Sequence, residues 1–216
     1  MKRSIQSVTV LAASVALLYV GQFTLFRWVL NAGMTMLGNP QYVGFAGIVL
    51  PHLLLYTTPL ALACLMAWWI FARLDWISLE FLRTSDRRSM KWGMAGGLAA
   101  LAFTVVFIGI VAPASIGYVE PNVWKIAGNI FSNLAEEIVF RGFFLVALTA
   151  VLGFWPAALL SSLAWGFTHY QYPLEFQLLI AGVGVGWSYV VQKTKSIWSA
   201  YVAHEVLDIL ADRLIS

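Results

Sequence analysis

One apolar stretch of this chain, from residue 124 to 153, carries residue types that could activate a water molecule. Its polar side chains recur at intervals of three and four, which places most of them on one stripe of a helix. They are Asn129, Ser132, Asn133, Glu136, Glu137 and Arg141. A charged side chain at the centre of a bilayer costs about 2.5 to 3.5 kcal/mol, so this cluster indicates a function. A carboxylate in a site of low dielectric constant can serve as a general base.

Glu137 and Arg141 are four residues apart, with the acid toward the N-terminus. This order favours an ion pair along a helix, and such a pair reduces the cost of removing both charges from water. We therefore expect Glu137 and Arg141 to pair with each other and to leave Glu136 free.

Two of the three histidines lie in short motifs within the later apolar stretches: His169 follows Trp165 by four residues, and His204 precedes Asp208 by four. His204 and Asp208 therefore share one helical face. Glu205 follows His204 as in the HExxH zinc motif, but position 208 is Asp where that motif requires a second His. No GxSxG nucleophile motif occurs. The predicted chemistry is that of carboxylate and imidazole groups.

The composition indicates which elements must position these groups. Hydrophobic residues make up 61% of the 216 residues and charged residues only 11%, which excludes a water-soluble globule. Because one crossing takes about 20 apolar residues, we predict an all-α integral membrane bundle of about seven transmembrane helices. The predicted spans are 8–26, 44–71, 93–111, 124–153, 155–170, 174–192 and 197–215.

The basic residues lie mainly in short segments between these spans, which predicts a multi-pass membrane protein with its N-terminus in the cytoplasm. The charged loop 73–91 and the segment with Lys193 and Lys195 would face the cytoplasm, and the nearly uncharged loop 113–121 would face outward. The net charge of +3 therefore reflects topology, and we expect a lipid bilayer as partner and no nucleic acid. A crude depth count predicts a site that opens toward the cytoplasmic half.

Several residues have a predicted packing role. Gly93 with Gly97, and Gly182 with Gly186, have the spacing that lets two helices approach closely. Cys64, the single cysteine, is expected to pack as a small hydrophobic residue. Seven tryptophans lie near predicted helix ends, where an indole suits the headgroup region: Trp28, Trp68, Trp69, Trp92, Trp124, Trp155 and Trp198.

Three ordered motifs carry a family resemblance: EExxxR at 136–141, an aromatic residue followed by His at 165–169, and HxxxD at 204–208. The sequence resembles the CAAX-protease and bacteriocin-processing family of intramembrane endopeptidases, which includes the type II CAAX prenyl endopeptidases. Its departures are Trp165 where Phe is usual and Asp208 in place of Asn.

The resemblance implies that Glu136 and His169 bind and activate the hydrolytic water. His204 and Asp208 would line the site and stabilise the oxyanion. An ionised aspartate cannot donate a hydrogen bond to an oxyanion, so Asp208 would have to be protonated, orient His204, or belong to a differently organised site.

The same resemblance divides the single membrane domain into two parts. Residues 124–216 would form the catalytic helices, supported by Glu137 and Arg141 in the first motif. Residues 1–123 would form three N-terminal transmembrane helices with the basic cytoplasmic loop 73–91. The implied activity is that of a CAAX-type endopeptidase acting on a membrane-anchored protein or peptide.

Three alternatives stay open. Zinc bound by Glu136, His169 and His204 is a possible cofactor, although we favour a glutamate mechanism without cofactor or metal. Intramembrane acids and histidines also serve proton relays, so an ion-coupled transporter is a second hypothesis. A noncatalytic immunity or scaffold protein on the same fold is a third.

Overall fold

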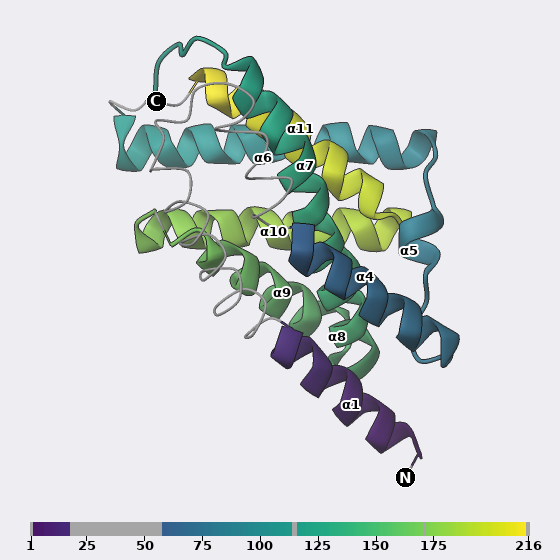
Figure 1. Cartoon of the computed structure of the whole chain (residues 1–216). Coiled ribbons are helices and arrows are strands. Elements are labelled where there is room, and N and C mark those ends of the chain that lie inside the picture. The colour runs from purple at the N-terminus through teal and green to yellow at the C-terminus, as the bar shows by residue number, and fades with distance from the viewer. Residues whose placement is uncertain (1, 18–57, 114–115, 171, 215–216) are drawn as a thin grey trace, which may run out of the picture.

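The computed structural model describes residues 2–17, 58–113, 116–170 and 172–214 and arranges them as a bundle of helices (Figure 1). No strand occurs among these residues, which confirms the predicted all-α class. The helices are α1 (Lys2–Ala16), α4 (Thr58–Arg73), α5 (Glu80–Arg83), α6 (Arg87–Val111), α7 (Val123–Glu137), η4 (Ile138–Phe144), α8 (Leu145–Leu152), α9 (Phe154–Thr168), α10 (Leu174–Thr194) and α11 (Ile197–Leu214). Much of the first predicted span, the start of the second and Trp28 lie outside the described residues.

From α6 onward, the helices follow the predicted spans closely except at the start of α6. We predicted that this helix begins at residue 93, whereas it begins at Arg87, inside the charged segment. Asp86 caps it, because its carboxylate accepts a hydrogen bond of 2.7 Å from the backbone N–H of Ser89. A short helix, α5, also lies in the segment that we predicted to be a loop.

The stretch predicted as one helix over 124–153 is a continuous helical run with a change of geometry in its middle. α7 passes into the π-helix η4, which passes into α8. A π-helix has wider turns than an α-helix and is often found at functional sites. The hydroxyl of Ser161, on α9, donates a hydrogen bond to the backbone oxygen of Phe140 in η4. This contact fastens the π-helix to α9.

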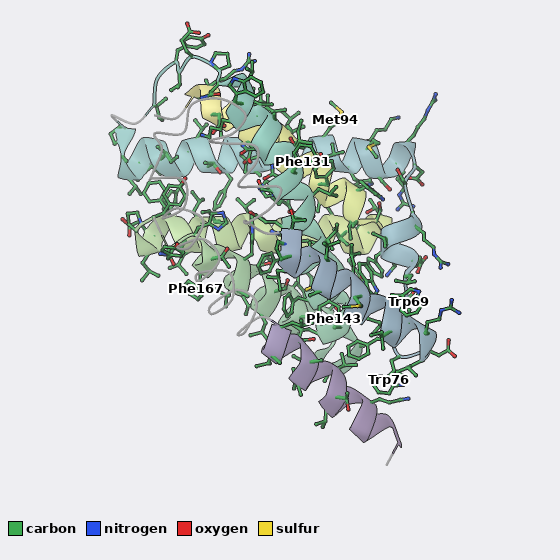
Figure 2. The ribbon with its side chains drawn as sticks, viewed as in Figure 1. Trp69, Trp76, Met94, Phe131, Phe143 and Phe167 are labelled. Atoms are coloured by element: carbon green, nitrogen blue, oxygen red, sulfur yellow. The ribbon has the colours of Figure 1, made fainter. Side chains whose placement is uncertain are left out.

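Two of the described helices, α6 and α10, are long and apolar enough to cross a membrane, judged by length and composition. α4 is apolar but shorter. Large apolar side chains such as Met94 and Phe131 stand on the surface of the bundle, whereas Phe143 is buried within it (Figure 2). An outer surface of this kind suits a lipid environment.

Glycines allow the closest approach between α6 and α11. A Cβ atom on Gly93 would lie 2.6 Å from the backbone oxygen of Ser199, and one on Gly97 would lie 2.7 Å from that of Ala203. The predicted contact at this glycine pair is therefore confirmed. The contact predicted for the second pair is wrong, because a Cβ on Gly186 would meet nothing within 4 Å.

Trp68 fastens α4 to the π-helix. Its side chain is fully buried, so its predicted place in the headgroup region is wrong. The indole N–H donates a hydrogen bond of 2.7 Å to the backbone oxygen of Ser78. The ring packs so closely on Gly142 that a Cβ there would lie 2.6 Å from it. Cys64, on the same helix, is buried as predicted.

The two ends of the bundle differ in charge. The hydroxyl of Ser196, in the turn after Lys195, donates a hydrogen bond to the backbone oxygen of Thr84, so the two basic segments lie at the same end. At the other end, the backbone N–H of Gly117 donates to the oxygen of Leu214, 3.0 Å away. α11 therefore runs from the basic end to the nearly uncharged loop.

Candidate active site

Three helices bring the predicted site residues together. Glu136 lies near the end of α7, His169 directly follows α9, and His204 lies within α11. Trp165, one turn before His169, lies between these three side chains.

The indole of Trp165 contacts each of them. Its N–H donates a hydrogen bond of 2.7 Å to Oε2 of Glu136. Its ring centroid lies 5.4 Å from that of His169 and 5.3 Å from that of His204, nearly perpendicular to both rings. Our expectation that Glu136 is free of partners is therefore wrong. That expectation considered only neighbours on the same helix, whereas the donor comes from α9.

Glu137 joins a buried cation to a buried imidazole. Its Oε1 lies 3.2 Å from Nη1 of Arg141, which confirms the predicted ion pair, and 2.9 Å from Nδ1 of His204. Glu137 and Arg141 are both fully buried. Nδ1 of His204 must carry a proton in order to donate to the carboxylate of Glu137. The same orientation of the ring directs Nε2 toward Oδ2 of Asp208, 3.8 Å away.

Two residues that we did not predict enclose the guanidinium of Arg141. Trp187 packs its ring 5.4 Å from the guanidinium carbon and 4.8 Å from the ring of His204. A Cβ atom on Gly184 would lie 2.8 Å from Nη2 of Arg141, so only glycine leaves enough room there. An aromatic residue and a glycine on an apolar helix are common in any membrane bundle, so the sequence offered no signal for either role.

Asp208 accepts hydrogen bonds from the facing helix. Its Oδ2 lies 2.9 Å from the amide nitrogen of Asn133 and 3.3 Å from that of Asn129. Asn133 also donates to Glu205, 3.2 Å away. The asparagines belong to the predicted polar stripe, but we had not counted them as site residues. Together these contacts form a polar seam between α7 and α11.

His169 is held by the backbone of its own helix. Its Nδ1 lies 3.0 Å from the backbone oxygen of Trp165, an acceptor, so Nδ1 is the donor. In the neutral form of the ring, Nε2 then carries the lone pair. The ring also stacks on that of Tyr172, with centroids 6.4 Å apart.

A cavity of about 510 Å³ adjoins the site. Most of the cavity wall is apolar and comes from α6, α10 and α11. Trp165 and Asp208 also line the cavity and connect it to the site. Lys125 and Asp212, paired at 2.7 Å, also line it. These two residues lie at the end of the bundle that carries the nearly uncharged loop. We predicted a site that opens toward the cytoplasmic half, to which we assigned the basic segments, whereas this cavity reaches the opposite end of the bundle.

The donor set does not fit the zinc alternative. Among the residues that the structure describes, no three His, Cys, Asp or Glu side chains are close enough together to hold a metal ion. Trp165 contacts each of Glu136, His169 and His204.

The part of the chain that builds this site has a known counterpart. A family model described as Type II CAAX prenyl endopeptidase Rce1-like matches residues 118–210, a range that includes all three motifs. No curated protein and no solved structure matches the chain. The family predicted from the motifs is thus confirmed: residues 118–210 match the Rce1-like type II CAAX prenyl endopeptidases.

Proposed function

We propose that this chain is an intramembrane endopeptidase that hydrolyses a peptide bond of a membrane-anchored protein or peptide. One observation carries the proposal: Glu136, His169 and His204 meet around one indole beside an apolar cavity. All of them lie within the range that matches a family of CAAX endopeptidases.

In this proposal Glu136 is the general base. It takes a proton from a water molecule, and the oxygen of that water attacks the scissile carbonyl carbon. Nε2 of His169, left with its lone pair, accepts a hydrogen bond from the same water. The proton on Glu136 then passes to the leaving amine as the C–N bond breaks. Water alone supplies the nucleophile, so no cofactor is required.

His204 is the proposed oxyanion donor. Because Nδ1 donates to Glu137, Nε2 is directed toward Asp208, which lines the cavity. In this proposal Nε2 also carries a proton, so His204 acts as an imidazolium between the carboxylates of Glu137 and Asp208. One donor near 3 Å from an oxyanion contributes about 3 to 4 kcal/mol to catalysis. Asp208 accepts hydrogen bonds, so its proposed role is to orient Nε2 of His204 and not to contact the oxyanion.

The proposal places the site in a multi-pass bundle of about seven transmembrane helices with a cytoplasmic N-terminus. The apolar outer surface and the two long apolar helices support this arrangement. The apolar wall of the cavity suits an apolar substrate segment that enters from the bilayer.

The test uses purified protein in detergent and a library of membrane-anchored peptides. Wild type is compared with Glu136→Ala and His169→Ala, with and without a chelator. Glu175→Ala, which removes an exposed carboxylate at the start of α10, is the matched control. We expect cleavage by wild type and the control, with or without chelator, and none by the two site variants.

Two results would argue against this mechanism. Loss of cleavage with the chelator would make the same residues metal ligands. A folded wild-type protein that cuts no peptide would contradict the proposal and favour the noncatalytic or transport hypothesis.

A further inference from the structure

We infer that Trp165 is a positioning residue, whose indole N–H holds Oε2 of Glu136 so that Oε1 is the oxygen that meets the water. The inference rests on the proposed function, in which Glu136 is the base. It gives Trp165 a role that a phenylalanine at the same position could not fill, because phenylalanine has no N–H group.

The hydrogen bond itself is the first support. Nε1 of Trp165 and Oε2 of Glu136 are 2.7 Å apart, and only 2% of Trp165 and 8% of Glu136 are exposed. A short bond from N–H to a carboxylate is among the stronger hydrogen bonds, and here little water competes for it. The terminal torsion of a glutamate is otherwise broad, so one fixed donor decides which oxygen points away from it.

The indole is itself held in place, which a positioning residue requires. The guanidinium of Arg141 lies 3.8 Å from the centre of the Trp165 ring system, and the ring of Trp187 lies 5.5 Å away. A cation over an indole face is attracted to it. Because Trp165 also lines the cavity, it fixes Glu136 relative to the space where a substrate would lie.

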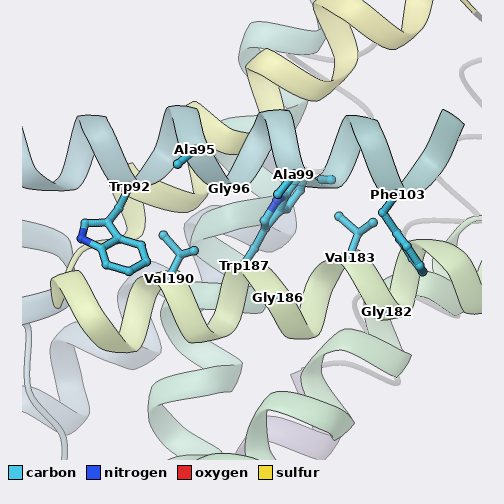
Figure 3. A pocket seen from close by; sticks show the side chains of 11 residues that line it. Trp92, Ala95, Gly96, Ala99, Phe103, Gly182, Val183, Gly186, Trp187 and Val190 are labelled. Carbon is cyan, nitrogen blue, oxygen red and sulfur yellow. The ribbon is translucent and has the colours of Figure 1, made fainter. Parts of the chain in front are cut away.

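Trp187 provides a matched control. It is buried, it contacts the same guanidinium, and it lies between α6 and α10 (Figure 3). Its N–H has no hydrogen-bond partner among the described residues. A Trp-to-Phe change at either position removes a similar volume, but only Trp165→Phe removes a donor to Glu136.

The kinetic test measures kcat and KM for wild type, Trp165→Phe and Trp187→Phe on a cleaved membrane-anchored peptide. We expect kcat of Trp165→Phe to fall by about 10-fold or more, with KM changed by less than about threefold. The loss of one hydrogen bond to a charged group corresponds to a fold-change of about this size. We expect kcat of Trp187→Phe, which keeps the donor to Glu136, to fall clearly less than that of Trp165→Phe. Equal kcat values for the two variants, with both proteins folded, would overturn the positioning role and leave the proposed function standing.

A second test needs no catalytic activity. The indole N–H signals of ¹⁵N-tryptophan-labelled protein are recorded for wild type and Glu136→Ala, with assignment by the two Phe variants. We expect the Trp165 signal to shift and its proton to exchange faster in Glu136→Ala, while the Trp187 signal changes little. An unmoved Trp165 signal would overturn the inference whether or not peptide is cleaved. A wild type that cuts nothing would instead overturn the proposed function, and the catalytic role of Trp165 with it.

Discussion

Replacing Glu137 by glutamine tests whether its negative charge holds the core of the site together. The change keeps the shape of the side chain and an oxygen that can accept from Nδ1 of His204. It removes only the charge that neutralises Arg141, whose guanidinium is fully buried. Removal of one partner of a buried ion pair leaves an uncompensated charge and costs about 3 to 5 kcal/mol.

The distance between the two charges gives a similar interaction energy. Two unit charges separated by the 3.2 Å between Oε1 of Glu137 and Nη1 of Arg141 attract each other by about 5 kcal/mol at an effective dielectric constant of about 20. We therefore expect Glu137→Gln to lower the free energy of unfolding by about 3 to 5 kcal/mol. The double variant Glu137→Gln/Arg141→Met removes both charges, so we expect it to be more stable than the single variant.

The assay is reversible unfolding in mixed detergent micelles, followed by circular dichroism. The pair Lys125–Asp212 is the control, because its atoms are closer, at 2.7 Å, but the Lys125 side chain is 55% exposed. Asp212→Asn should cost no more than about 1 kcal/mol. A cost for Glu137→Gln within about 1 kcal/mol of that control, or a double variant less stable than the single one, would refute the reasoning.

Three further predictions concern the helices around the site. Gly97→Ala should destabilise the protein by about 1 to 3 kcal/mol in the same unfolding assay, because its Cβ would lie 2.7 Å from a backbone oxygen of α11, whereas Gly186→Ala should be neutral or slightly stabilising. Ser161→Ala should cost about 0.5 to 1.5 kcal/mol, because it removes one of two hydrogen bonds to the backbone oxygen of Phe140, which also accepts from the backbone N–H of Leu145; no measurable cost would show that the contact with α9 does not stabilise η4. Hydrogen bonds from the backbone N–H and hydroxyl of Ser89 lower the pKa of Asp86, so its contribution to stability should be complete at pH 7 and lost as the pH falls through that lowered value. The stability difference between wild type and Asp86→Ala should therefore shrink at low pH, and a difference that grows there would contradict the assignment.

Features that depend on neighbours along one helix could be predicted from the sequence. The helical spans follow from apolar length, and the pair Glu137 and Arg141 follows from its spacing of four residues. A close helix approach at Gly93 and Gly97 follows from their spacing of four residues, whereas the identity of the partner helix, α11, does not. In each case the sequence signal lies within a few residues of the chain.

Features that depend on contacts between distant segments could not be predicted. The bond from Trp165 to Glu136 joins residues 29 positions apart, and neither residue type requires the other. The π-helix has no distinct apolar period, so residues 138–144 resemble the rest of their helix. The position of the cavity depends on how α6, α10 and α11 diverge, which is a property of the assembled bundle.

The two departures from the family pattern illustrate why partners on other helices decide the chemistry of this site. A polar group in an apolar interior is costly unless a neighbour satisfies it. The N–H that Trp165 adds in place of a phenylalanine is satisfied by Glu136, and the carboxylate of Asp208 in place of an amide is satisfied by the amides of Asn129 and Asn133. Each departure therefore comes with a partner of the opposite hydrogen-bonding character on α7. Both contacts attach α7 to another helix, so the polar groups proposed to carry the reaction also fix the arrangement of the helices that present them.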